Sequence, residues 1–195
     1  MEINEINKKI NNKELLTENE INYYLKCLNK QIKNDFNIEA NPMQCKEIAF
    51  KVCYDYTRNF DQENFITVEF STEDLKLEEI THLSSFLEFK TNNGYLCFIV
   101  DPTSIQFYTK NYHSNIGDIN ILDNLNTAQL NVLKELITNG YVKANINSLT
   151  NYINIFLAPL DISAGKKEFI RDKFIAFCYK YQIIQSSDNL IKKKK

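Results

Sequence analysis

The architecture follows from residues 81–107, which read THLSSFLEFKTNNGYLCFIVDPTSIQF and predict two strands joined by a tight turn. Asn93-Gly94 is a strong hairpin signal, because both central residues of a type I′ turn need a positive φ. With these two residues in the turn, the register places Asp101 opposite Phe86. The chain therefore contains an antiparallel hairpin near its middle.

Two polar side chains fall on one face of this hairpin. Alternate residues of a strand share a face, so His82 at the start of the first strand lies on the same side as Asp101 at the end of the second. Two strand pairs separate them in this register, and a bend or bulge would bring the carboxylate diagonally to the imidazole. A three-residue loop would instead put the two groups on opposite faces. A carboxylate that orients an imidazole is part of a catalytic triad.

Cys45 is the candidate nucleophile for such a triad. Pro42 disfavours the helical conformation at the residue before it, so a helix is expected over residues 43–60 with Cys45 in its first turn. The helix dipole and the unpaired backbone N–H groups there favour the thiolate. The same amides can form an oxyanion hole. The alternative interpretation is that Cys45 is a small buried hydrophobic residue.

The order of these groups resembles a known family. A helix that opens on Cys45, a strand that opens on His82 and a strand that ends in Asp-Pro-Thr at residues 101–103 are similar to the transglutaminase-like branch of the papain-like cysteine enzymes. The resemblance covers residues 41–107, about a third of the chain. Two features differ from the family. Met and Gln precede the Cys where the family usually has Gly, and the family's aromatic residue after the His, often Trp, is missing because the chain has no Trp.

The resemblance implies both a fold and a set of roles. It implies an α+β fold in which a helix carrying Cys45 packs on an antiparallel sheet, with additional helices at both ends. It implies that Cys45 is the nucleophile, His82 the general base and acid, and Asp101 the orienting group. The oxyanion donors would be the Cys backbone N–H and an upstream polar side chain, for which Gln44 and Asn41 are the candidates.

His113 is the competing candidate for the base. The chain has only two His, and His113 lies in a polar connection over residues 108–124 that is expected to be a loop. Loops often carry catalytic groups.

The remainder of the chain is predicted to be mainly helical. One domain spans residues 1–195, divided into an N-terminal helical segment (1–35), the catalytic-type helix and sheet (36–124) and a C-terminal helical part (125–195). Residues 1–15 are polar and expected to fray. A capping box at Thr17 and Glu20 begins a helix. A strand and three later helices are expected over residues 64–70, 126–139, 148–157 and 166–184.

The composition excludes several classes of protein. With 23 basic and 25 acidic residues the net charge is −2, which gives no electrostatic footprint for nucleic acid. Five Cys without a CxxC pair and only two His argue against a zinc finger and favour free thiols in a reducing compartment. No sequence motif for a metal or a cofactor is present.

The sequence also predicts where the protein acts. No apolar run reaches membrane-spanning length, and the charged N-terminus lacks the apolar core of a signal peptide. The expected place of action is the cytosol, including the cytosol of a host cell reached through a dedicated secretion system. The four C-terminal Lys are expected to form a solvated tail and not a stable membrane anchor.

The predicted chemistry is acyl transfer through a thioester. Water would resolve a glutamine-derived thioester to give deamidation, an amine would give transglutamination, and attack on a main-chain amide would be proteolysis. The expected function is a protein-glutamine deamidase that acts as a bacterial effector or toxin on a host protein. The alternatives are a cysteine protease of the same fold and a non-catalytic interaction module that uses residues 126–184.

Overall fold

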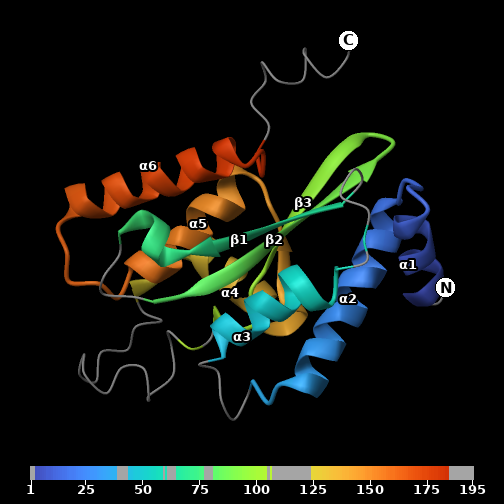
Figure 1. Ribbon diagram of the computed structural model, residues 1–195. Coiled ribbons are helices and arrows are strands. Elements are labelled where there is room, and N and C mark those ends of the chain that lie inside the picture. The colour runs from blue at the N-terminus through green and yellow to red at the C-terminus, as the bar shows by residue number, and fades with distance from the viewer. Residues whose placement is uncertain are drawn as a thin grey trace.

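The computed structural model describes residues 3–38, 44–58, 60, 65–76, 81–104, 106 and 124–184. Within this part of the chain the fold is α+β, with six α-helices and one four-stranded antiparallel sheet (Figure 1). In chain order the elements are α1 (Ile3–Asn11), α2 (Glu18–Asp35), α3 (Cys45–Phe50), the π-helix η1 (Lys51–Asp55), β1 (Phe65–Ser71), the 3₁₀-helix η2 (Thr72–Leu75), β2 (Leu83–Thr91), β3 (Gly94–Val100), α4 (Thr127–Asn139), β4 (Tyr141–Lys143), α5 (Ile146–Leu157) and α6 (Ala164–Lys180).

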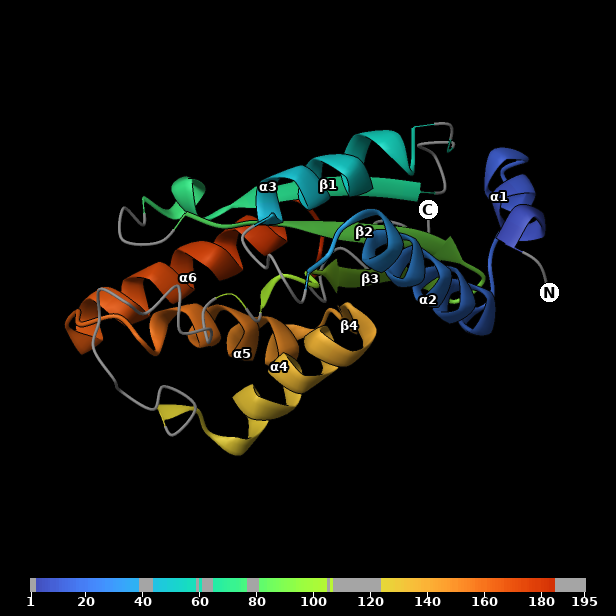
Figure 2. The ribbon, with the colours of Figure 1, turned by 90° about the horizontal axis from the view of Figure 1, so that it is seen from below.

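The sheet lies between two layers of helices (Figure 2). Its strand order is β1-β2-β3-β4, and every neighbouring pair is antiparallel. One hydrophobic cluster joins α1, α2 and α3 to one face of the sheet, including Leu87 and Phe98. A second cluster joins α4, α5 and α6 to the opposite face, including Phe86 and Ile99. Because side chains alternate along each strand, the central hairpin supplies both cores.

The hairpin forms as predicted, but its turn lies one residue earlier. Thr91 pairs with Gly94, so the turn residues are Asn92 and Asn93, not Asn93 and Gly94. Neither Asn has a positive φ, whereas Gly94 has φ +109°. Glycine therefore supplies the positive φ just after the turn, as in hairpins where a type I turn is followed by a bulge. The type I′ prediction was wrong for this reason.

The corrected register brings the two polar groups closer together. Phe86 pairs with Ile99, and continuing this pairing places Asp101 opposite Ser84 and not opposite Phe86. Asp101 is then one strand pair from His82 instead of two. The parity of the register is unchanged, so the predicted shared face is confirmed. Because the two groups are one strand pair closer in this register, no bulge is needed to bring them together.

The N-terminal residues are more ordered than expected. The structure has helix α1 in this segment, where the sequence predicted fraying, and α1 buries Ile6 and Ile10 in the core. Lys9 forms an ion pair with Glu20, which holds α1 against α2. The predicted capping box of α2 is confirmed, because Thr17 accepts from the Glu20 N–H and the Glu20 carboxylate accepts from the Thr17 N–H.

Strand β4 is a feature that the sequence pattern did not predict. Gly140 ends α4 with φ +77°, and the chain then pairs for three residues with β3. The Asp101 N–H donates to the Gly140 carbonyl at 3.0 Å, so this short strand supports the end of β3.

Among the residues that the structure describes, none of the helices combines the length and apolar character needed to cross a bilayer.

Candidate active site

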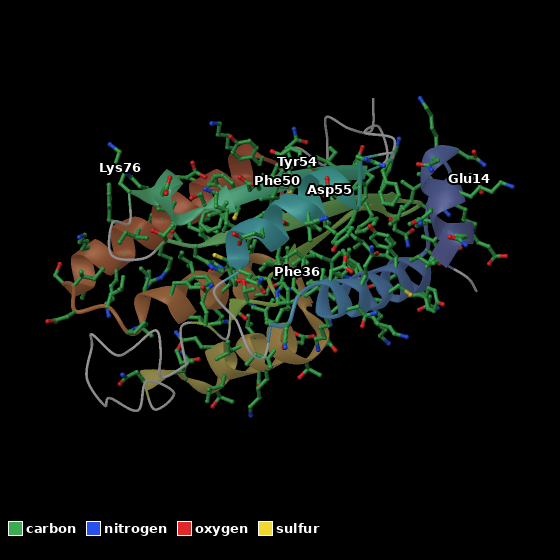
Figure 3. The ribbon with its side chains drawn as sticks, turned by 60° about the horizontal axis from the view of Figure 1, so that its bottom comes forward. Glu14, Phe36, Phe50, Tyr54, Asp55 and Lys76 are labelled. Atoms are coloured by element: carbon green, nitrogen blue, oxygen red, sulfur yellow. The ribbon has the colours of Figure 1, made fainter. Side chains whose placement is uncertain are left out.

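Cys45 lies at the start of α3, with its side chain directed toward the sheet. Gln44 is the N-cap, and α3 packs against β2. The opposite side of α3 and η1 carries Phe50 and Tyr54, which are more than half exposed (Figure 3). Their rings pack at a tilt, with the centroids 4.9 Å apart. Cys45 is only 8% exposed, and the nearby Leu83 backbone N–H helps to lower the pKa of its thiol. The helix therefore presents its thiol to the first residues of β2.

His82 and Asp101 form a buried pair next to this thiol. Nε2 of His82 lies 2.8 Å from Oδ2 of Asp101, and both side chains are inaccessible to solvent. The Cys45 thiol lies near enough to His82 for the two groups to shift each other's pKa. Thiol, imidazole and carboxylate thus lie together in one buried cluster.

Two further side chains hold the Asp101 carboxylate, and a backbone carbonyl holds its main chain. The Thr103 hydroxyl donates to Oδ1 at 3.0 Å, and the Tyr152 hydroxyl donates to Oδ2 at 2.8 Å. The Gly140 carbonyl fixes the Asp101 backbone. Both carboxylate oxygens therefore accept hydrogen bonds from neighbouring side chains, as a buried polar group requires.

Gln106 contacts the other ring nitrogen of His82. Its Nε2 lies 2.7 Å from Nδ1 of His82, and the residue is 1% exposed. An amide nitrogen only donates, so Nδ1 accepts this hydrogen bond when the imidazole is neutral. When the ring is protonated, the carboxamide must present Oε1 to Nδ1–H instead.

The electrostatics of Cys45 and His82 favour a thiolate and an imidazolium over two neutral groups. Burial alone raises the pKa of the Cys45 thiol, but the hydrogen bond and the charge of His82, with the Leu83 N–H, bring that pKa below its ordinary value. Burial lowers the pKa of His82, but the charge and hydrogen bond of Asp101, followed by those of Cys45, raise it to about 9. A thiolate beside an imidazolium is the reactive form of a cysteine nucleophile.

The other buried cysteines show the opposite behaviour. Burial raises the pKa of Cys53 to about 11 and that of Cys178 to about 12, and it also raises the pKa of Cys97. None of these three has a histidine among the groups that shift its pKa. The lowered pKa at Cys45 therefore comes from its position beside His82 and not from helix or sheet placement in general.

The structure brings Cys45, His82 and Asp101 together, as the sequence predicted, and their catalytic roles stay a prediction. Gln44 lies beside Cys45, and its Oε1 is buried without a hydrogen-bond partner among the described residues. Asn41, the other oxyanion candidate, lies outside the described residues, as does His113, the competing base.

Sequence reasoning missed three contributors to the site. Thr103 belongs to the Asp-Pro-Thr sequence and Gln106 follows three residues later, but the sequence pattern predicts no contact with the site for either residue. Tyr152 gave no signal, because it falls on the apolar stripe of α5 and looks like a core residue. Within the described residues, no group of three or more His, Cys, Asp or Glu gathers to hold a metal ion.

No protein-family model, curated protein or solved structure matches this chain. The site is thus defined by its own residues, a thiol beside a buried pair of imidazole and carboxylate.

Proposed function

We propose that the protein is a cysteine-dependent amide hydrolase with a papain-like or transglutaminase-like core. Cys45 is the nucleophile, His82 the general base and acid, and Asp101 the group that fixes the imidazole. The observation that carries the proposal is the buried hydrogen bond between His82 and Asp101 beside Cys45, whose thiol pKa is lowered by His82. A satisfied structural histidine needs no thiol partner with a lowered pKa, whereas a nucleophile does.

The geometry supports a two-step reaction. The Cys45 thiolate attacks the amide carbonyl carbon, and the resulting tetrahedral intermediate collapses to a thioester as the C–N bond breaks. The proton on Nδ1 of His82 passes to the leaving nitrogen, which departs as ammonia or an amine. A water molecule then gives a proton to Nδ1 and attacks the thioester, which releases the acid and restores the thiolate–imidazolium pair. Asp101 holds the Nε2–H throughout.

The negative oxygen of the intermediate needs donors near Cys45. The Cys45 backbone N–H lies in the first turn of α3, where it has no helical acceptor. The Gln44 carboxamide is the second candidate, acting through its Nε2 group. One such donor contributes about a hundredfold or more to turnover.

Within this chemistry we favour deamidation of a glutamine side chain in a protein, by an effector or toxin that acts in the cytosol of a host cell. The resemblance in residue order and spacing supports this choice. No metal or cofactor takes part in the proposed reaction. A cysteine protease would use the same groups on a main-chain amide.

The test compares the wild type with Cys45→Ala on an N-acylated glutaminyl-glycine peptide and on unfolded casein. We expect ammonia release and a mass gain of about one dalton per modified glutamine with the wild type, and neither with the variant. Cys27→Ala is the matched control, because Cys27 is a partly exposed cysteine of α2 and should leave activity unchanged. Both variants should melt close to the wild type.

The outcomes separate the possible functions. Shortened peptides instead of a mass gain would indicate the protease. A Cys45→Ala variant as active as the wild type would refute the nucleophile assignment. No Cys45-dependent change in either substrate, together with ordinary alkylation of Cys45, would favour the interaction module.

A further inference from the structure

Besides His82, the Asp101 carboxylate contacts one near neighbour in sequence and one residue of a distant helix. The Thr103 hydroxyl, two residues later in the chain, donates to Oδ1 at 3.0 Å. The Tyr152 hydroxyl, which comes from α5, donates to Oδ2 at 2.8 Å. Oδ2 is also the oxygen that lies 2.8 Å from Nε2 of His82. The direction in which this oxygen points therefore depends on a contact with the C-terminal helical layer.

The Tyr152 hydroxyl is itself held in place by packing. Its ring is fully buried, meets the Phe156 ring edge-on at 4.7 Å between centroids, and lies 6.1 Å from the Phe174 ring of α6. Burial, followed by the charge of Asp101, holds the pKa of Tyr152 well above its usual value. The hydroxyl therefore keeps its proton at neutral pH and stays a donor to the carboxylate.

Helix α5 contacts the imidazole as well as the carboxylate. Phe156 follows Tyr152 by four residues, so the two side chains share a face of the helix. The Phe156 ring lies 5.1 Å from the His82 ring, at an interplanar angle of 37°. The same helix face therefore restricts the tilt of the imidazole and directs the carboxylate oxygen that its Nε2 meets.

We propose that Tyr152 is a positioning residue of the active site, which holds Oδ2 of Asp101 against Nε2 of His82 and through this pair keeps Cys45 reactive. This inference rests on the proposed function and adds to it a residue that supports the triad from the opposite layer. Tyr152 is inaccessible to solvent, so its effect on the reaction passes through Asp101.

Two other roles for this hydroxyl predict different results. If it only satisfies a buried carboxylate, its loss lowers stability and leaves Cys45 as reactive as before. If it only draws negative charge away from Oδ2, its loss strengthens the attraction between Asp101 and His82, and the Cys45 thiolate forms at lower pH. If it positions Oδ2, its loss weakens the contact with Nε2, and the thiolate forms at higher pH.

The experiment measures the rate at which iodoacetamide alkylates Cys45 as a function of pH, by peptide mapping. The groups that act on the charge of His82 are Asp101 at the end of β3 and Cys45 at the start of α3. In Tyr152→Phe we expect the midpoint of the pH profile to rise by about half to one pH unit, since one hydrogen bond to the carboxylate is lost. Below the midpoint, alkylation then slows about 3- to 10-fold.

Tyr24→Phe is the matched control for the loss of a buried hydroxyl. Tyr24 belongs to α2, is 4% exposed, and its hydroxyl has no hydrogen-bond partner among the described residues. Its substitution should leave the midpoint unchanged. Circular dichroism and thermal melting establish that each variant is folded at the temperature of the measurement.

Asp101→Asn tests whether Tyr152 acts through the carboxylate. Adding Tyr152→Phe to Asp101→Asn should move the midpoint by less than about 0.2 pH unit, because the group that Tyr152 positions is already gone. An equal shift in both backgrounds would overturn the proposal. An unchanged or lower midpoint in Tyr152→Phe alone would also overturn it.

Phe156→Leu is a second variant, for the case that Tyr152→Phe does not fold. It keeps the Tyr152 hydroxyl but removes the ring that supports it and lies against His82. We expect the midpoint to rise in the same direction. A midpoint equal to that of the wild type would contradict the positioning role.

Alkylation needs no substrate, so failure of this inference is distinguishable from failure of the proposed function. If Tyr152→Phe leaves the midpoint unchanged but Cys45→Ala abolishes ammonia release, only the role of Tyr152 is lost. If the wild type releases no ammonia from the glutaminyl-glycine peptide but the midpoint shifts as expected, the positioning role stands and the deamidase assignment is lost.

Discussion

Tyr152 donates a hydrogen bond of 2.8 Å to Oδ2 of Asp101, the same oxygen that Nε2 of His82 contacts. Tyr152 belongs to α5, more than fifty residues after the carboxylate. One turn later on this helix, Phe156 packs against the His82 ring with the centroids 5.1 Å apart. Helix α5 thus contacts both members of the pair, so the C-terminal helical layer is part of the site and not an appendage to it.

Tyr152→Phe should destabilise the protein while keeping its packing. The substitution retains the ring, which lies 4.7 Å from Phe156, and deletes only the hydroxyl donor to a buried carboxylate. We expect the free energy of unfolding in urea to fall by about 1–2 kcal/mol. Tyr141→Phe is the matched control, because its hydroxyl makes only a 3.4 Å hydrogen bond, to the Asn22 carbonyl, and should matter less. Equal losses in the two variants would contradict the assigned role.

Stability should decline as the pH rises above neutrality. Burial lowers the pKa of His82, but Asp101 and Cys45 raise it from 6.5 to about 9. A raised pKa stabilises the fold fully below about pH 6.5, and this contribution is lost as the pH approaches 9. Its upper limit is about 3 kcal/mol, since each pKa unit is worth about 1.4 kcal/mol. The lowered pKa of Cys45 acts in the opposite sense and makes the observed decline smaller.

Asp101→Asn should remove most of that decline. The neutral amide no longer attracts the imidazolium, so burial dominates and the pKa of His82 falls. Urea titrations of both proteins at several pH values between about 6 and 9.5 measure the two slopes. Parallel slopes would show that another group causes the pH dependence.

The part of this site that could be predicted from the sequence depends on local patterns in the chain. The alternation of the hairpin placed His82 and Asp101 on one face, and the break at Pro42 placed Cys45 in the first turn of a helix. These are short-range properties of the chain. The exact turn was not predictable, because an Asn-Asn-Gly sequence accommodates the positive φ either inside the turn or just after it.

The same local patterns could not predict contacts between segments that are far apart in the sequence. Tyr152 reaches Asp101 only because α5 packs on the sheet face that carries the carboxylate, and its spacing on the helix is that of an ordinary core residue. The three residues of β4 are too few to show an alternation, and α1 depends on the burial of Ile6 and Ile10 against other elements.

Gly140→Ala should disturb the site from a distance. Gly140 has φ +77°, and an added Cβ would lie only 2.1 Å from Oδ1 of Asn29. Its carbonyl accepts the Asp101 N–H, so a shift of this turn moves the end of β3. We expect a loss of about 1–3 kcal/mol in the free energy of unfolding. Gly165→Ala in α6 meets no atom within 4 Å and should be neutral or slightly stabilising.

Cys45 should react before the other cysteines at mildly acidic pH. Its pKa is lowered by His82, whereas burial raises the pKa values of Cys53, Cys97 and Cys178. We expect iodoacetamide at about pH 6 to label Cys45 first, since the thiolate is the reactive species. Peptide mapping at increasing times measures the order of labelling. In Asp101→Asn, His82 loses the charge that keeps it protonated, so labelling of Cys45 should slow. Preferential labelling of a different cysteine in the wild type would show that His82 does not activate Cys45.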